Sequence, residues 1–114
     1  MSDSLFLKIV AGEIPADIVH ETDNVLAFRD VNPQASTHVL VIPKRRIPTV
    51  NDLTEEDAPV IGEMFLVAKA VAAAEGLADD GYRLVMNCNE HGGQTVFHIH
   101  LHLIGGRPLG WPPG

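Results

Sequence analysis

Residues 94–106 read QTVFHIHLHLIGG, and within them hydrophobic and polar residues alternate strictly from Phe97 to Leu103. The odd positions from Phe97 to Leu103 are apolar, and the even positions between them carry His98, His100 and His102. A two-residue period is typical of a strand that buries one face. We therefore predict a strand over this segment, with three imidazoles in a row on the face opposite the apolar one.

The rest of the pattern predicts further strands and two helices. Short apolar runs bounded by turn residues predict strands at residues 18–21, 25–29, 38–43 and 82–87. Apolar residues at helical spacing, with start signals near Asp57 and a stop at Gly76, predict one long helix. Residues 107–114 are too rich in Pro and Gly for either element, and we expect an extended tail anchored by Trp111.

A short helix is predicted directly after Ser4, which is a good N-cap residue. Its apolar stripe contains Leu5, Phe6 and Ile9. A helix this short is stable only when docked, so the stripe either joins the core or forms one wall of an apolar ligand pocket.

Length and composition indicate one domain over residues 1–114, with 46% apolar residues to build its core. No apolar run is long enough to span a membrane, and the N-terminus does not resemble a signal peptide. The single cysteine, Cys88, cannot form an internal disulfide, which fits a cytoplasmic protein. The net charge of −7 argues against a sequence-independent nucleic-acid binder.

Three histidines in one strand suggest either a metal site or acid/base and nucleophilic chemistry. Side chains at i and i+4 of a strand are roughly 13 Å apart, so one zinc ion could bind two of the three at most. A neutral imidazole can instead attack phosphorus while its neighbours stabilise the phosphoryl oxygens. We favour phosphorus chemistry, with a metal pair and inert solvated histidines as the alternatives.

Glycine pairs flank the histidine row on both sides. Gly92-Gly93-Gln94-Thr95 precedes it and can aim main-chain N–H groups at an anion, while Gly105-Gly106-Arg107 follows it with a guanidinium suited to an oxyanion. Taken singly, each pair is equally well an ordinary turn. Asp30 is similarly ambiguous, because it could bind vicinal hydroxyls of a ribose or cap the turn before Pro33.

The histidine row also resembles the signature of a known family, the histidine triad superfamily. The residues that carry this resemblance are His98-Ile99-His100-Leu101-His102-Leu103-Ile104. The resemblance to its nucleotide-binding branch extends over nearly the whole chain. It includes Ile14-Pro15-Ala16, Phe28-Arg29-Asp30, Thr37-His38, Val41 to Lys44, Gly92 to Thr95, Gly105 to Arg107 and Trp111 to Gly114.

This resemblance implies an α+β fold with a bent antiparallel sheet of about five strands, joined into a larger sheet in a homodimer. It implies hydrolysis of purine nucleoside phosphoramidates, including adenosine 5′-phosphoramidate and aminoacyl-type adenylates linked through nitrogen. The reaction would pass through a covalent nucleotidyl-histidine and would need neither metal nor cofactor.

The resemblance also implies a role for individual residues. His100 would be the nucleophile, His102 would bind the phosphoryl oxygens, His98 would orient the site, and His38 would support the triad. Asp30 would bind the ribose. The remaining expected contacts are Asn87, Gly93, Gln94 and Thr95 around the phosphate, with Leu5, Phe6, Ile9, Phe28, Val31 and Leu40 around the base.

Three features depart from the family pattern: Thr95 replaces a serine, Arg46 stands where animal members have a further histidine, and the tail differs from theirs at Pro108-Leu109-Gly110. They bear on substrate preference and leaving-group handling rather than on the nucleophile. The rival functions are a dinucleoside polyphosphate hydrolase, a nucleotide-binding or scaffold protein with vestigial turnover, and a metal-binding module.

Overall fold

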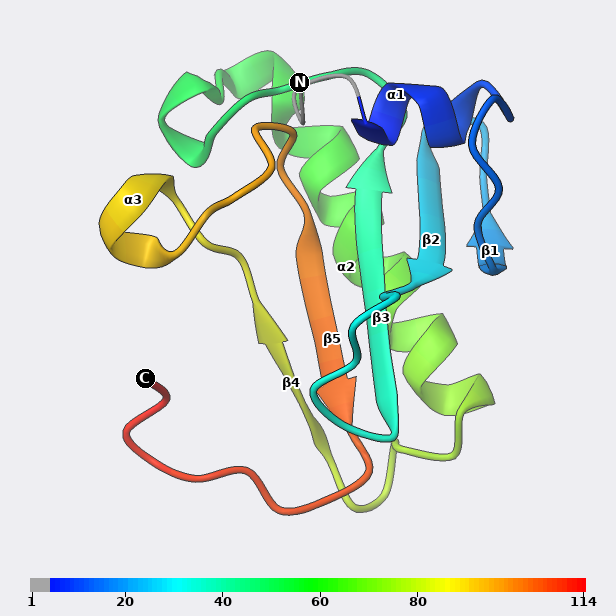
Figure 1. The fold of residues 1–114 in the computed structure, drawn as a ribbon, viewed down its shortest axis with the longest axis vertical. Coiled ribbons are helices and arrows are strands. Elements are labelled where there is room, and N and C mark those ends of the chain that lie inside the picture. Colours follow the sequence, from blue (N-terminus) through cyan, green and yellow to red (C-terminus); the bar gives the residue numbers. More distant parts are fainter. Residues whose placement is uncertain (1–4) are drawn as a thin grey trace.

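The computed structural model describes residues 5–114, which form three α-helices, two 3-10 turns and five strands (Figure 1). The predicted Ser4 cap lies outside the described residues. The helices are α1 (Leu5–Val10), α2 (Ala58–Ala74) and α3 (Asn89–Gly92), and the 3-10 turns η2 (Val50–Asp52) and η3 (Glu55–Asp57) precede α2. The strands are β1 (Ile18–Glu21), β2 (Val25–Arg29), β3 (Thr37–Pro43), β4 (Tyr82–Val85) and β5 (Leu101–Gly105).

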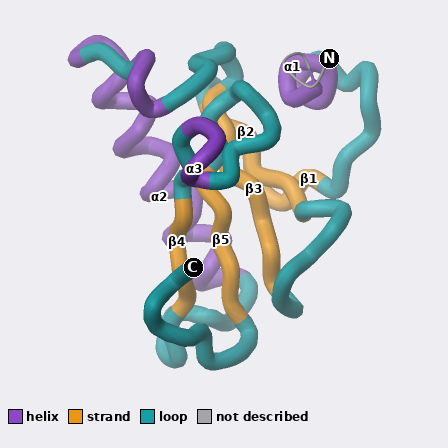
Figure 2. The backbone as a smooth tube through the Cα atoms, turned by 60° about the vertical axis from the view of Figure 1, so that its left-hand side comes forward, coloured by secondary structure: helices purple, strands orange, loops and turns teal. Residues whose placement is uncertain are grey.

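All five strands form one open antiparallel sheet in the order β1-β2-β3-β5-β4. The α+β fold with five strands, one long helix and one short helix is therefore confirmed. The sheet has two differently covered faces, because α2 runs along one of them while α1 lies over the other near the top of β2 and β3 (Figures 1 and 2).

The face beneath α2 holds the larger core. Pro59 stands in the first turn of α2, where a missing N–H costs nothing, and Gly76 ends the helix with a φ of +77°. The buried helix residues Met64, Val67, Ala68, Val71 and Ala72 pack on odd-numbered strand residues, namely Val25, Ala27, Val39, Val41, Leu101 and Leu103.

The opposite face carries the even-numbered residues of the same strands. Leu26, Phe28, Leu40 and Ile42 form a second, smaller core with Phe6 of α1. Because β3 is buried at every position, both of its faces are covered, as its nearly continuous apolar sequence predicts. The histidines share the parity of this second face.

The predicted strand over residues 94–106 is too long, because β5 begins only at Leu101. Pairing between β3 and β5 ends at Val41 and Leu101, although β3 itself continues to Pro43. Ile99 instead donates its N–H to Ile47 O at 2.8 Å. The alternation of sides persists without a ladder, since Ile99 is fully buried in the core beneath α2.

Two other local predictions differ from the structure. Helix α3 was not expected, and Gly93 ends it in the left-handed conformation with a φ of +85°. Trp111 does not anchor the tail, because 83% of its surface is exposed. The tail is held instead by Arg83, which donates to Gly110 O at 2.7 Å. Over residues 5–114, none of the helices has the length and apolar character needed to cross a membrane.

Two glycines give opposite predictions for replacement by alanine. A Cβ on Gly105 would lie 2.7 Å from Leu77 Cδ1 and 3.3 Å from Tyr82 Cβ, whereas a Cβ on Gly62 meets nothing within 4 Å. We expect Gly105→Ala to lower the free energy of unfolding by about 1–3 kcal/mol through overpacking. Gly62 is an exposed residue of α2, and Gly62→Ala should raise the free energy of unfolding by about 0.5–1 kcal/mol. Urea unfolding measures both, and equal effects would contradict the packing described here.

Candidate active site

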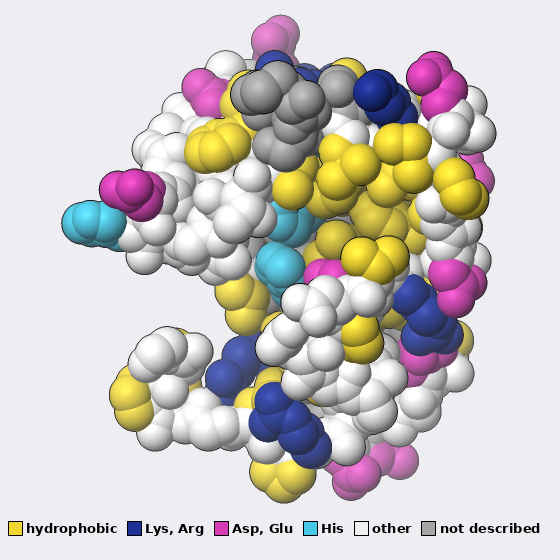
Figure 3. Space-filling model, in the orientation of Figure 1, with side chains coloured by type: hydrophobic (Ala, Val, Ile, Leu, Met, Phe, Trp, Pro, Cys, Tyr) yellow, Lys and Arg dark blue, Asp and Glu magenta, His cyan; other side chains and the backbone are white. Residues whose placement is uncertain are grey.

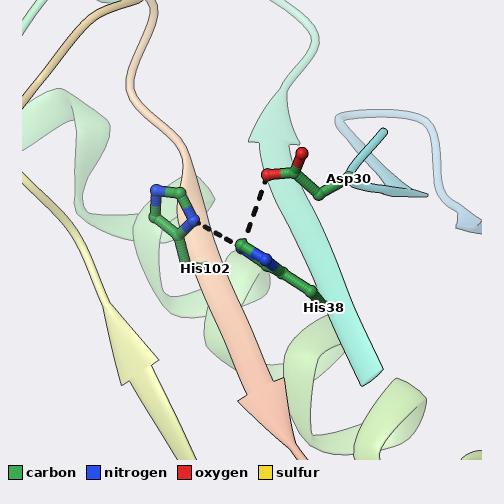
Figure 4. A group of neighbouring side chains, drawn as sticks. All are labelled: Asp30, His38 and His102. Atoms are coloured by element: carbon green, nitrogen blue, oxygen red, sulfur yellow. Dashed lines mark hydrogen bonds and ion pairs between the residues drawn. The ribbon is translucent and has the colours of Figure 1, made fainter. Parts of the chain in front are cut away.

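Strand register brings three polar side chains from distant parts of the sequence together (Figure 4). Leu40 of β3 pairs with Phe28 of β2 on one side and with His102 of β5 on the other. His38 is two residues before Leu40 and Asp30 is two residues after Phe28, so both share the face of His102. His38 Nε2 lies 2.9 Å from His102 Nδ1 and 3.4 Å from Asp30 Oδ2.

The hydrogen bonds of His100 assign its proton to one nitrogen. Its Nδ1 lies 2.8 Å from His98 O, and a carbonyl oxygen can only accept. Nδ1 therefore carries the hydrogen, and Nε2 of the neutral ring keeps its lone pair. Nε2 of His100 is thus available for attack on an electrophile.

The hydrogen bonds of His38 assign the opposite tautomer to His102. The main-chain N–H of Gln34 donates to His38 Nδ1 at 3.0 Å, so this nitrogen is an acceptor and the hydrogen of the neutral ring is on Nε2. His38 Nε2 then donates to His102 Nδ1, and the hydrogen of His102 is on its own Nε2. His100 and His102 therefore present different groups, one a lone pair and the other an N–H donor.

Burial keeps the rings of His98, His100 and His102 uncharged near neutral pH. Desolvation lowers the pKa of His98 and His100, which are 0% and 7% exposed, and the carbonyls of Pro43 and His98 oppose this only in part. The pKa of His102 falls to about 4, first through burial and then through His100 and His38, with Asp30 acting in the opposite direction. A neutral ring is the form that can act as a nucleophile.

Phe6 connects the short helix to the histidines. Its ring meets His98, His100 and Phe28 edge to face, with centroids 5.5, 5.2 and 5.5 Å apart. Phe6 itself is 3% exposed and is the buried residue of α1. The first helix is therefore both core and pocket wall, and it shields the ring of His100 from water.

An apolar cavity of about 320 Å³ opens beside His100 and His102, and Figure 3 shows hydrophobic side chains around a hollow in which histidines are visible. Its lining contains most of the predicted contacts: Leu5, Phe6, Ile9, Phe28, Asp30, Val31, Leu40, Thr95, His100 and His102. Val31 contributes from the rim, since it is 99% exposed. The lining residues that were not predicted are Ile14, Pro15, Ala16, Arg29 and Val96.

Three predicted phosphate contacts lie outside this lining. Gln94 is buried and uses its whole amide within the protein, donating to Pro48 O and Val96 O and accepting from the N–H of Asn89. It thereby fastens the segment before the histidines to the rest of the chain. Gly93 ends α3, and Asn87 is half-buried between β4 and α3. Their predicted contacts with substrate remain predictions.

Arg46 and Arg107, which the sequence analysis singled out, both donate hydrogen bonds to main-chain oxygens. Arg46 donates from Nε to Phe97 O at 2.9 Å, next to the histidine segment. Arg107 does not line the cavity and donates to Gln34 O and Pro108 O at 3.2 and 3.3 Å. The expected oxyanion contact of Arg107 therefore has no support in its position.

Asp30, His38 and His102 are also the described residues whose ligand atoms could surround a metal ion, since these atoms lie within 4.8 Å of one another. An ion on His38 Nε2 would move the hydrogen of that ring to Nδ1, against the N–H of Gln34. Two donors would then face each other. The hydrogen-bonded arrangement thus fits these three side chains better than metal coordination does.

The HIT domain model matches residues 11–109. The chain belongs to the HIT family. It is 57% identical over 108 residues to a purine nucleoside phosphoramidase of Escherichia coli K12, covering 95% of this chain and 91% of that protein. A HIT-like protein of Synechococcus elongatus is 55% identical over 98% of this chain and 97% of its own length. The crystal structure of a HIT family hydrolase of Legionella pneumophila matches this structure with a TM-score of 0.95 at 56% sequence identity, and the match covers 96% of this chain and 98% of that one. These HIT relatives support hydrolase activity.

The low pKa of His102 predicts a pH-dependent stability. The pKa of His102 is about 4 in the folded protein and 6.5 in the unfolded chain, so the unfolded chain binds a proton at a higher pH. The neutral buried ring therefore contributes its full stability above about pH 6.5, and that contribution is lost as the pH falls toward 4. His102→Asn keeps an acceptor for His38 but cannot titrate. We expect wild type to lose about 1–2 kcal/mol more than this variant between pH 7 and pH 5 in urea unfolding.

The exposed His91 of α3 provides the control for this measurement. His91→Asn should show the same pH dependence as wild type. Equal losses in wild type and His102→Asn would show that His102 is not the group whose protonation destabilises the fold.

Proposed function

We propose that this protein hydrolyses purine nucleoside 5′-phosphoramidates to a nucleoside monophosphate and an amine, without a metal. The observation that carries the proposal is the pair of opposite tautomers at His100 and His102 beside an apolar cavity. A lone pair and an N–H donor, side by side, suit attack on phosphorus with stabilisation of its oxygens. The E. coli relative carries the name of this activity.

In the first step, His100 Nε2 attacks the α-phosphorus and forms an N–P bond while the P–N bond of the substrate breaks. The leaving nitrogen takes a proton and departs as the amine. Water then attacks the phosphorus of the nucleotidyl-histidine, and the N–P bond breaks with the electron pair returning to Nε2. The proton that water loses replaces, through the Thr95 hydroxyl, the one that the leaving nitrogen took in the first step. One ring serves both halves of this double displacement because a neutral imidazole is a good leaving group.

The surrounding residues divide the remaining tasks. His102 Nε2–H donates to a phosphoryl oxygen, and Thr95 supplies a hydroxyl at the cavity for proton transfer. Asp30 binds the ribose hydroxyls, although Oδ1 already accepts the N–H of Asn32 at 2.8 Å, because each carboxylate oxygen can accept twice. The apolar lining receives the base. It offers shape rather than polar readout, so adenine and guanine both fit the proposal, as do lysyl-type adenylates that differ only in the amine.

The first test is AMP release from adenosine 5′-phosphoramidate in EDTA. We expect turnover by wild type and a decrease of more than about 1,000-fold in His100→Ala, because the nucleophile is lost. AMP binding should persist in the variant, since the cavity remains. A dinucleoside polyphosphate assayed in parallel tests the main rival, and His91→Ala serves as the control on an exposed ring.

Each alternative outcome selects one rival. Faster turnover of the dinucleoside polyphosphate would identify that compound, and not the phosphoramidate, as the better substrate. AMP binding without turnover of either compound would favour a nucleotide-binding or scaffold protein. Turnover abolished by EDTA and restored by zinc would refute the metal-free mechanism.

We also propose that the protein forms a homodimer through the side of the sheet that ends at β4. Among the strands of residues 5–114, β4 pairs only with β5, so its outer edge offers main-chain groups to a second strand. Tyr82 of β4 is 36% exposed, and Phe65 and Leu66 of α2 are 46% and 66% exposed. Large apolar side chains at such levels are typical of an interface core. That this protein is cytoplasmic, consists of a single domain and does not bind nucleic acids stays a prediction.

Light scattering after size-exclusion chromatography tests the dimer. Leu66→Asp should shift the wild-type dimer to a monomer, because a carboxylate at an apolar interface is left without a partner. Ile18→Asp is the matched control, since Ile18 is 47% exposed on β1 at the opposite edge of the sheet. A monomeric wild type, or a dimer that survives Leu66→Asp but not Ile18→Asp, would contradict this interface.

A further inference from the structure

The loop of residues 31–36, between β2 and β3, contains the group that decides the tautomer of His38. This group is the main-chain N–H of Gln34, which donates to His38 Nδ1 at 3.0 Å. Gln34 is exposed, unlike the histidine it contacts. A main-chain N–H in an exposed loop keeps its direction only if the loop is held in place.

Part of what holds the loop comes from the loop itself. Asn32 donates its N–H to Asp30 Oδ1 at 2.8 Å, and the side chain of Gln34 donates to Asn32 O at 3.0 Å. These short-range bonds shape the turn but do not fasten Gln34 to the sheet.

The segment that follows β5 supplies a contact from elsewhere in the chain. Arg107 donates from Nη2 to the carbonyl of Gln34 at 3.2 Å. Gly106, with a φ of +107°, lies so close to the loop that a Cβ there would be 1.9 Å from Ser36 Oγ. Gly106 and Arg107 thus contact both the middle and the end of the loop.

We propose that Arg107 is a positioning residue for the histidine site. By holding the carbonyl of Gln34, it keeps the N–H of the same residue on His38 Nδ1 and so fixes the proton of His102 on Nε2. Arg107 acts through three hydrogen bonds, at 3.2, 3.0 and 2.9 Å, and does not line the cavity. The kinetic consequence rests on the proposed function, whereas the tautomer assignment does not.

Two proton arrangements are chemically possible along His38 and His102. In the first, His38 Nε2 donates to His102 Nδ1, and His102 Nε2–H faces the cavity. In the second, both hydrogens sit on Nδ1, and His102 donates to His38 while its Nε2 offers a lone pair. The second arrangement sets His38 Nδ1–H against the N–H of Gln34, which is unfavourable while Gln34 stays in place.

The second arrangement would remove the donor that faces the phosphoryl oxygens, leaving two adjacent lone pairs on His100 and His102. Asp30 Oδ2, 3.4 Å from His38 Nε2, also favours the first arrangement. Loss of the Arg107 contact should therefore produce a mixture of tautomers rather than a complete switch.

The experiment is a long-range ¹H–¹⁵N correlation spectrum of the full-length protein with labelled histidines at pH 7. Wild type should show the Nε2–H tautomer for both His38 and His102, and Arg107→Ala should show averaged or split nitrogen shifts for both rings. Arg83→Ala is the matched control, because Arg83 also binds a main-chain oxygen of the tail but does not touch the loop. Its histidine spectrum should match wild type.

The kinetic measurement uses the same variants. Arg107→Ala should slow the nucleotidylation step with adenosine 5′-phosphoramidate by roughly threefold to tenfold and leave KM within about twofold. Arg107→Lys, which keeps one cationic donor, should recover part of both the spectrum and the rate.

Unchanged tautomers in Arg107→Ala, or the same change in Arg83→Ala, would overturn the proposal. A wild type without turnover would refute the proposed function alone, because the spectrum reports the tautomers independently of any substrate. Should Arg107→Ala unfold, Arg107→Gln gives the same comparison with a shorter, uncharged donor.

Discussion

The register of β2, β3 and β5 is the constraint on which the site depends. Phe28, Leu40 and His102 lie side by side across these strands, so residues two positions away on the same face also meet. A slip of one residue would move His38 to the face beneath α2 and leave an imidazole among aliphatic side chains. The core on that face therefore enforces the site on the other, because Val39 and Val41 can be buried beneath α2 only in the register that turns His38 toward His102.

Burial gives the histidines their chemistry as well as their position. An exposed imidazole is partly protonated near neutral pH, whereas desolvation lowers the pKa of His98, His100 and His102. Buried neutral rings usually have partners for their N–H groups: those of His98 and His100 donate to carbonyls, and that of His38 donates to the ring of His102. These obligatory hydrogen bonds are what separate the roles of two adjacent and chemically identical side chains. The nucleophilic role proposed for His100 therefore needs no charged group beside it.

Much of this arrangement could be predicted from the sequence because it follows from side-chain period and turn chemistry. Strand parity placed the histidines on one face, and the apolar stripe of Leu5, Phe6 and Ile9 gave the pocket wall. Other features depend on contacts between distant segments, which periodicity does not encode. The ladder ends early where the N–H of Ile99 donates to Ile47 O, and the Gln94 amide is buried against Pro48 and Val96. Arg107 looked like an oxyanion ligand because a cation beside glycines usually suggests one, but its partner is the carbonyl of Gln34.

The placement of Arg107 illustrates how an exposed residue can matter to a buried site. A salt bridge on the surface contributes little, because water competes for both partners. A hydrogen bond that selects between two tautomers acts differently, since the two tautomers of a neutral imidazole are close in energy and a small bias changes their populations. The chain from Gln34 to His102 has this property, because each nitrogen along it can be donor or acceptor and only its end is a fixed donor. Whatever holds Gln34 therefore has influence at His102 out of proportion to its own strength.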